Sequence, residues 1–145
     1  MELIKWPFLK QDWGIEFESS KGAYLYTKDG REVLDAAGGA IVSNIGYGRE
    51  EVAEAVARAV KNNSYILPPF LTPEREALLD ELRDHWLPPH LSRIHLSSGG
   101  SEANESAVKL AIQYQNSRGK PEKNTILTRS LSYHGTTLNM SGISG

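Results

Sequence analysis

The sequence predicts an α/β protein in which helices cross over between the parallel strands of an incomplete sheet. Short runs rich in β-forming residues alternate with amphipathic helical patterns in the second half of the chain. This order is typical of parallel sheets with crossover helices. The length of 145 residues suits one domain or part of a larger one. No apolar run approaches the roughly 20 residues that cross a bilayer.

Composition and charge exclude several classes of function. Sixteen basic residues against eighteen acidic ones give a formal charge of -2, so no general attraction to nucleic acid or anionic membranes is expected. The chain has no cysteine, which excludes disulfides, thiolate metal sites and cysteine nucleophiles. The first residues lack the apolar core of a signal peptide. We therefore expect a cytoplasmic protein.

A β-hairpin is the first element that the sequence predicts after an N-terminal arm of about 12 residues. Two runs rich in β-formers, 23–27 and 31–35, flank the turn sequence Lys-Asp-Gly at 28–30. The glycine-rich stretch 36–48 follows. Because glycine permits positive φ and close backbone approach, this stretch is expected to be a tightly packed loop region.

Three helices and two strands are predicted after this loop region. Valines and alanines recur at helical spacing over residues 49–62. A second helix begins at Thr72, with threonine as N-cap and proline at the first helical position. A third helix runs over about 101–118, between short strands at 93–97 and 125–128.

A candidate phosphate-binding loop joins the first of these strands to the third helix, with the sequence Ser-Ser-Gly-Gly-Ser at 97–101. The first turn of a helix leaves N–H donors without partners and carries partial positive charge. Glycines let this backbone close around an anion, and the Ser101 hydroxyl can add a hydrogen bond. A plain turn with a serine cap is the alternative. The nucleotide P-loop lysine and the dinucleotide glycine pattern are both missing from this loop.

A second candidate segment, Tyr133-His134-Gly135, follows the next predicted strand. Parallel strands deliver their carboxyl ends to one edge of a sheet, so Tyr133 is expected in the same crevice as the glycine loop. An aromatic ring there can stack on a planar cofactor, and Gly135 lets the backbone pass beneath it. A core tyrosine beside an ordinary turn is the alternative.

Together, Gly-Gly-Ser-Glu-Ala-Asn-Glu at 99–105 and Tyr-His-Gly at 133–135 resemble the class III pyridoxal-phosphate-dependent aminotransferases, the ω-aminotransferase group. The run 22–35 is similar to the early hairpin of that family, and Gly-Tyr-Gly at 46–48 stands where many members have Gly-His. The resemblance covers roughly residues 14–145 and identifies the chain as an N-terminal portion.

The resemblance implies the N-terminal part of the fold-type I fold of PLP-dependent transferases. Residues 1–70 correspond to an arm, hairpin and helix of the small domain, and residues 71–145 to the start of the large cofactor-binding domain. The family is a dimer with active sites at the subunit interface. Its N-terminal arm packs nearby, so Trp13 or the region 43–45 is expected to approach the substrate.

The resemblance also implies the cofactor, pyridoxal 5'-phosphate, and the residues that hold it. Backbone amides and a hydroxyl of the glycine loop grip the phosphate, the tyrosine stacks on the pyridine ring, and the next two residues form the wall behind it. In chain order these cofactor-binding residues are Gly99, Gly100, Ser101, Tyr133, His134 and Gly135.

Transamination also needs a lysine that forms a Schiff base with this cofactor and an acid beside the pyridine nitrogen. In the family both lie beyond the portion that this chain resembles. The lysines here do not stand in the family's context; Lys109, for example, is expected on an exposed helix side, paired with Glu105. We therefore expect no catalytic residue in this chain, and activity only as part of an assembly.

Three explanations for the missing lysine stay open. The chain is a subunit of a split enzyme with a complementary C-terminal polypeptide, or a truncated product, or a non-catalytic relative that acts as a binding or assembly module. The catalytic interpretation predicts transfer of an amino group from an amine or ω-amino acid to an oxo acid, in a dimer or higher oligomer. The first two explanations also predict a large apolar surface exposed in isolation.

Two rival chemistries have weak signals. His85, His90 and His95 are evenly spaced, but the prolines at 88–89 interrupt any helix that aligns them, so no metal site is expected. Serines near the glycine loop together with His134 suggest a hydrolase. The G-x-S-x-G nucleophile elbow is missing from the sequence, which disfavours that interpretation.

Overall fold

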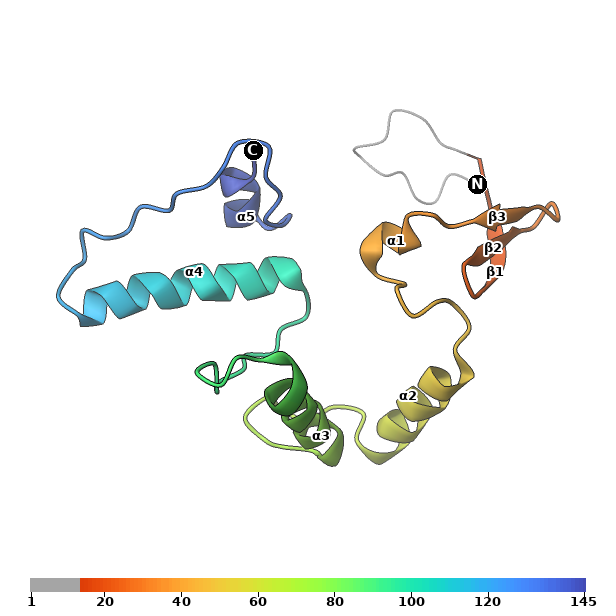
Figure 1. Ribbon diagram of the computed structural model, residues 1–145, viewed down its shortest axis with the longest axis horizontal. Helices are drawn as coiled ribbons and strands as arrows, with labels where there is room; N and C mark the ends of the chain where they lie inside the picture. The colour runs from red at the N-terminus through yellow and green to blue at the C-terminus, as the bar shows by residue number, and fades with distance from the viewer. Residues whose placement is uncertain (1–13) are drawn as a thin grey trace. The chain divides into compact units, whose positions relative to one another are not determined.

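The computed structural model describes residues 14–145, and the chain divides into two units between Tyr65 and Ile66. Figure 1 shows the elements along the chain. Within the described residues, the first unit holds a small antiparallel sheet and two helices, and the second holds helices joined by extended segments. The domain division at residues 70 and 71 concerns a complete protein and stays a prediction.

The sheet of the first unit has the strand order β1-β2-β3. β1 covers Phe17–Lys21, β2 covers Tyr24–Thr27 and β3 covers Glu32–Leu34. β2 and β3 pair antiparallel, which confirms the predicted hairpin. Its turn is closed by a hydrogen bond of 3.0 Å from the N–H of Gly30 to the carbonyl of Thr27. β1 is not predicted from the sequence, because Phe-Glu-Ser-Ser-Lys holds few β-forming residues.

The glycine-rich stretch after β3 contains a left-handed turn, α1, over Gly38–Ile41. The φ angle is 56° at Gly38, 59° at Gly39, 61° at Ala40 and 67° at Ile41. For a residue with a Cβ atom, this left-handed conformation is about 1–2 kcal/mol less stable than the right-handed one. The stretch is a loop region, as expected, but the tight packing is wrong for the described chain, since Ile41 is 81% and Val42 80% exposed. Ala40 and Ile41 are held in an unfavourable backbone conformation.

The carboxylate of Asp35 holds this left-handed turn in place. Its Oδ1 accepts a hydrogen bond from the N–H of Ala37 at 3.1 Å. Its Oδ2 accepts from the N–H of Gly39 at 2.8 Å and from the hydroxyl of Tyr47 at 2.7 Å. The Tyr47 hydrogen bond is the largest of the causes that lower the pKa of Asp35. These donors favour the ionised carboxylate, so the charged form of Asp35 stabilises the turn.

α2 covers Glu50–Asn62 and confirms the first predicted helix. Acids occupy its first turn and a lysine its last, which suits the helix dipole. Val52, Val56 and Val60 recur at intervals of four residues and share one face. Their exposed fractions are 41%, 57% and 55%. The face of α2 that is built to pack is thus uncovered in the described part of the chain.

α3 begins the helical part of the second unit and covers Pro73–Glu81. Its start matches the prediction, since the hydroxyl of Thr72 accepts a hydrogen bond from the N–H of Arg75 at 3.3 Å and proline takes the first helical position. A π-helical turn, η1, continues the helix over Leu82–Trp86. The helix ends before the two prolines, as expected.

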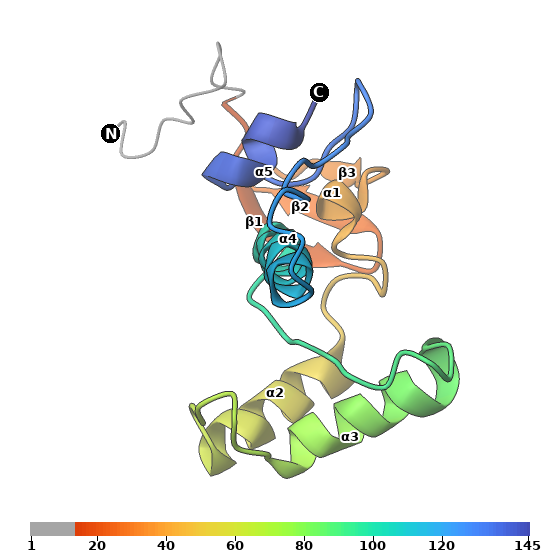
Figure 2. The same ribbon diagram turned by 90° about the vertical axis from the view of Figure 1, so that its left-hand side faces the viewer.

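α4 covers Gly100–Ser117 and confirms the third predicted helix, while α5 is a short helix over Leu138–Ile143. The chain between them runs back along α4, so that α5 contacts α4 (Figures 1 and 2). Met140 of α5 is 1% exposed and is the one buried apolar side chain in residues 14–145. No helix in that range is both long enough and apolar enough to span a membrane.

The two predicted strands at 93–97 and 125–128 are not formed, so this part of the prediction is wrong for the chain by itself. Neither segment pairs with another strand in the described residues. A strand is stabilised by hydrogen bonds to a neighbour, and a parallel sheet also needs cover on both faces. Here the two segments neither pair with each other nor with the antiparallel sheet.

Candidate functional site

The start of α4 has the properties of an anion-binding loop. Gly99 is the N-cap, with an extended φ of -172°, and Gly100 opens the helix. A Cβ atom at Gly100 would have no neighbouring atom within 4 Å, so the space beside Gly100 is open. N–H groups of the first turn and the helix dipole favour a negative group there. The residues present therefore fit a phosphate group.

The Glu102 carboxylate folds back over this loop. A Cβ atom at Gly99 would lie 2.9 Å from Oε2 of Glu102. Glu102 belongs to the first turn of α4, where the helix dipole stabilises its negative charge. The start of α4 thus already has one negatively charged group beside it, the carboxylate of Glu102.

Ser101 lies against the segment that carries the second group of predicted residues. Its Oγ accepts a hydrogen bond of 3.0 Å from the N–H of Thr136. A Cβ atom at Gly135 would stand 2.6 Å from Ser101 Oγ and 2.9 Å from its Cα, and Gly135 has a φ of 140°. Only glycine permits this approach. Because Oγ accepts here, the Ser101 hydroxyl keeps its hydrogen for a ligand.

His134 is fixed at three of its atoms. Its main-chain N–H donates to Ser144 Oγ at 3.0 Å, and its main-chain carbonyl accepts from Asn104 Nδ2 at 2.7 Å. Its ring Nε2 lies 2.9 Å from Thr128 Oγ1. The backbone beside the predicted stacking residue is therefore held both by its own segment and by α4.

Tyr133 is uncovered within residues 14–145. The residue is 76% exposed, although its neighbour His134 is held against α4. Many apolar side chains in residues 14–145 are exposed to a similar degree, Leu127 at 92% among them, so the core-tyrosine alternative stays open. Tyr133 is available for an aromatic contact with a ligand.

A polar face of α4, made of Ser101, Asn104 and Glu105, makes the hydrogen bonds between this helix and residues 134–139. The spacing of three and four residues places the three side chains side by side on the helix. Glu105 Oε2 accepts from Nδ2 of Asn139 at 3.2 Å. The expected ion pair between Glu105 and Lys109 is not formed, so that prediction is wrong.

Asn104 contributes to this geometry and Asp35 to the separate left-handed turn of the first unit, but neither is singled out from the sequence. Asn104 stands inside the quoted motif, and its spacing of three residues from Ser101 is the signal that places both on one helix face. Asp35 precedes the glycine-rich stretch, and an aspartate in that position is a common partner for backbone N–H groups of a turn.

The other candidate groups lie elsewhere or outside the described residues. His85 is 3.8 Å from Glu81 in an ion-pair geometry. Within residues 14–145, no group of three or more histidine, cysteine or acidic residues is placed to hold a metal ion. Trp13 lies outside the described residues. The region 43–45 includes Ile45, which is 61% exposed, and its approach to a substrate stays a prediction.

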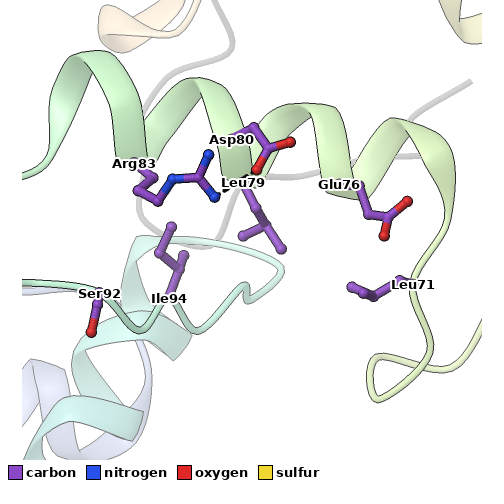
Figure 3. Close-up of a pocket in the computed structure, with 7 residues that line it drawn as sticks. All are labelled: Leu71, Glu76, Leu79, Asp80, Arg83, Ser92 and Ile94. Atoms are coloured by element: carbon purple, nitrogen blue, oxygen red, sulfur yellow. Dashed lines mark ion pairs between the residues drawn. The ribbon is translucent and has the colours of Figure 1, made fainter.

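A surface cavity of about 500 Å³ lies beside α3, away from the residues predicted to bind a cofactor. Figure 3 shows that Arg83 and Asp80 pair with each other inside it, at 2.8 Å. Arg83 is thus already paired with an acid, and the carboxylate of Glu76 adds a further negative charge to the lining. The lining residues are Leu71, Glu76, Leu79, Asp80, Arg83, Ser92 and Ile94.

Comparison with known proteins gives consistent matches. The family described as Aminotransferase class-III matches residues 10–145. A probable aminotransferase of Mycobacterium tuberculosis is 40% identical over 125 residues, covering 86% of this chain and 27% of that protein. The diaminobutyrate–2-oxoglutarate transaminase of Halomonas elongata is 34% identical over 133 residues, covering 91% of this chain and 28% of that protein.

The solved structures give the same result for the fold. The PLP-bound structure of an amine transaminase from an uncultivated Pseudomonas species is 26% identical, with a TM-score of 0.88. The match covers 100% of this chain and 34% of that one. The chain therefore spans about a third or less of the length of the proteins it matches.

Proposed function

Because the chain belongs to the class III aminotransferases and is an N-terminal portion of one, we propose that it forms the cofactor-phosphate-binding part of an enzyme that moves an amino group from an amine or ω-amino acid to an oxo acid. Membership confirms the family resemblance, the fold-type I class and pyridoxal 5'-phosphate as the cofactor of that class. The roles of individual residues are proposals.

The contact between Ser101 and Thr136 is the observation that carries the proposal. This hydrogen bond of 3.0 Å joins the glycine loop at the start of α4 to the segment with Tyr133, His134 and Gly135. This contact between two motifs that are far apart in sequence supports a single site made of both. A phosphate and a planar ring on the same small molecule match this pairing of an anion-binding loop with an exposed aromatic side chain.

Each predicted residue has a defined task at this site. Gly99 and Gly100 expose N–H groups to the phosphate, and Ser101 donates its hydroxyl hydrogen to it. Tyr133 stacks on the pyridine ring, while His134 and Gly135 form the wall behind it. Bound pyridoxal phosphate supplies the electron sink for the reaction. The protein residues bind and orient it.

The lysine that holds the cofactor and the acid at its ring nitrogen come, in this proposal, from a second polypeptide or from a C-terminal part. Within residues 14–145, no lysine makes a hydrogen bond or ion pair with the glycine loop or with residues 133–135. The exposed valines of α2 and the unpaired segments 93–97 and 125–128 support this requirement, because both need cover. Assembly as a dimer or higher oligomer and a cytoplasmic location stay predictions.

The test is a cofactor titration of the assembled protein combined with native mass spectrometry. Ser101→Ala together with Gly100→Asp removes a hydroxyl donor and places negative charge against the phosphate. We expect pyridoxal phosphate to bind about a hundredfold more weakly, since a hydrogen bond to a charged group contributes about 1.5–3 kcal/mol. Ser117→Ala, at the other end of the same helix, is the matched control and should change nothing.

Two outcomes contradict the proposal in different ways. Unchanged affinity in the double variant would remove the phosphate-binding role from the glycine loop. Native mass spectra that contain this chain alone and never the cofactor would instead favour the alternative, a non-catalytic relative that acts as a binding or assembly module. A complex with a larger polypeptide and cofactor is the expected result.

A further inference from the structure

We propose that Asn104 is a positioning residue, which holds the ring of Tyr133 at the right distance from the phosphate loop by binding the His134 carbonyl. The inference rests on the proposed function, because it assigns a task in cofactor binding. The inference goes beyond the proposed function because Asn104 is assigned a task without contacting the cofactor's phosphate or its ring.

The geometry of the cofactor creates the need for such a residue. The phosphate and the ring belong to one small molecule, so their separation varies little. A protein that grips both must therefore keep its phosphate loop and its stacking residue at a matching separation. The loop opens α4, whereas Tyr133 lies on an extended segment that no sheet supports in the described residues.

The contact between Ser101 and Thr136 does not by itself fix the separation between the phosphate loop and Tyr133. Gly135 separates Thr136 from His134 and Tyr133, so the Thr136 contact fixes the backbone on one side of Gly135 only. A second tie is required on the other side of Gly135. Asn104 supplies it, because its Nδ2 donates to the carbonyl of His134 at 2.7 Å.

Asn104 is also the one α4 side chain bonded to His134 within residues 14–145. The other two partners of His134 are Thr128 and Ser144, which belong to the same extended segment and its following helix. They order the segment internally, whereas Asn104 connects it to the helix that carries the phosphate loop. Asn104 and Ser101 lie one turn apart on the polar face of α4, so both ties are fixed to one rigid element.

The sharpest substitution is Asn104→Asp, which keeps the shape and replaces the N–H donor by a carboxylate oxygen. That oxygen faces the His134 carbonyl and repels it. In the cofactor-loaded assembly we expect pyridoxal phosphate to bind roughly tenfold more weakly. The circular dichroism of the bound cofactor should fall, because the ring loses its fixed orientation, while competition by inorganic phosphate stays unchanged. Asn104→Leu, which removes the donor without adding charge, should act in the same direction.

A double-mutant cycle separates positioning from a general loss of structure. If Asn104 acts through Tyr133, Asn104→Asp has no further effect on cofactor affinity once Tyr133→Ala is present. Gln113→Glu makes the same amide-to-carboxylate change in the middle of α4, at an exposed position, and should leave affinity and dichroism as they are.

The outcomes distinguish this inference from the function on which it rests. No binding of pyridoxal phosphate by the unsubstituted assembly overturns the proposed function and this inference with it. Normal binding there, with unchanged affinity and dichroism in both Asn104 variants, overturns only the inference. Effects of Asn104→Asp and Tyr133→Ala that simply add in the cycle also overturn it.

Discussion

The hairpin of the first unit and the segments 93–97 and 125–128 of the second are all rich in β-forming residues, yet only the hairpin forms a sheet. In the hairpin, β2 and β3 are joined by a tight turn and pair in register. In the second unit the two segments stay unpaired within the described residues. They are separated in sequence by the whole of α4.

The difference shows what each kind of pairing requires. An antiparallel pair needs only a turn between its strands, so nearby residues supply everything. A parallel pair needs a crossover connection, neighbouring strands and cover on both faces. Strand-forming sequence is thus sufficient when the partner is local. It is insufficient when the partner belongs to another part of the fold.

The largest expected effect comes from adding the missing partner. In the chain alone, we expect the amide of Leu25 in β2 to exchange hydrogen ~100-fold more slowly than the amides of Ile94 and Leu127. In the assembly with a C-terminal aminotransferase portion, Ile94 and Leu127 should become protected to at least the same degree. Hydrogen exchange followed by mass spectrometry measures both states. Protection of Ile94 in the chain alone would show that its partner is already present.

The next largest effect tests the local turn. Gly30 has a φ of 86° in the hairpin turn, so Gly30→Ala should lower the free energy of opening the hairpin by about 1–2 kcal/mol. Hydrogen exchange at the β2 amides measures this free energy of opening. Gly142→Ala is the control, since Gly142 lies in α5 without positive φ and a Cβ there meets no atom within 4 Å. That control should be neutral or stabilise by about 0.5 kcal/mol.

A smaller effect compares two threonines at helix starts. Thr72 caps α3 with its hydroxyl, whereas Thr137 at the start of α5 makes no cap and its Oγ1 has no partner. Thr72→Ala should cost about 1 kcal/mol in local stability of α3. Thr137→Ala should cost nothing measurable. Equal losses at both positions, determined by hydrogen exchange in each helix, would contradict this account.

The smallest expected effect concerns pH and the left-handed turn. The hydroxyl of Tyr47 and backbone N–H groups lower the pKa of Asp35, so its contribution to the turn is present above its unfolded pKa and is lost as pH falls through the folded one. The NMR shift of the Gly39 amide should stay constant above about pH 5 and change below about pH 4. Asp35→Asn should abolish this titration, and an unaltered titration in that variant would assign it to another group.

Much of the fold is predictable from the sequence because its signals are local. The Asp-Gly turn, the Thr72 cap with its proline, and the periodicity of α2 and α4 each depend on residues close in the chain. Gly135 and Ser101 were singled out separately, and the structure brings them into contact. Backbone geometry favours glycine at a close approach and serine at a helix start, so both positions can be recognised in the sequence from their residue types.

The remaining features depend on contacts that cannot be predicted from the sequence. The Asn104 amide binds a carbonyl 30 positions away, and any residue could supply that carbonyl. Ala40 and Ile41 adopt positive φ, which neither residue favours by itself, beside a turn whose N–H groups the Asp35 carboxylate binds. The unpaired segments were predicted as strands because their composition reports propensity and not the presence of a neighbour.

The absence of a side chain at Gly135 has a consequence for how this protein can vary. The space that a side chain at position 135 would need is already filled by Ser101, since a methyl group at 135 would overlap atoms of that residue. One of the overlapped atoms is the main-chain Cα of Ser101, which every residue has, so no replacement at position 101 makes room for a side chain at 135. A chain that keeps this close approach between the two segments is confined to glycine at 135. A library designed to change substrate preference gains nothing by randomising that codon.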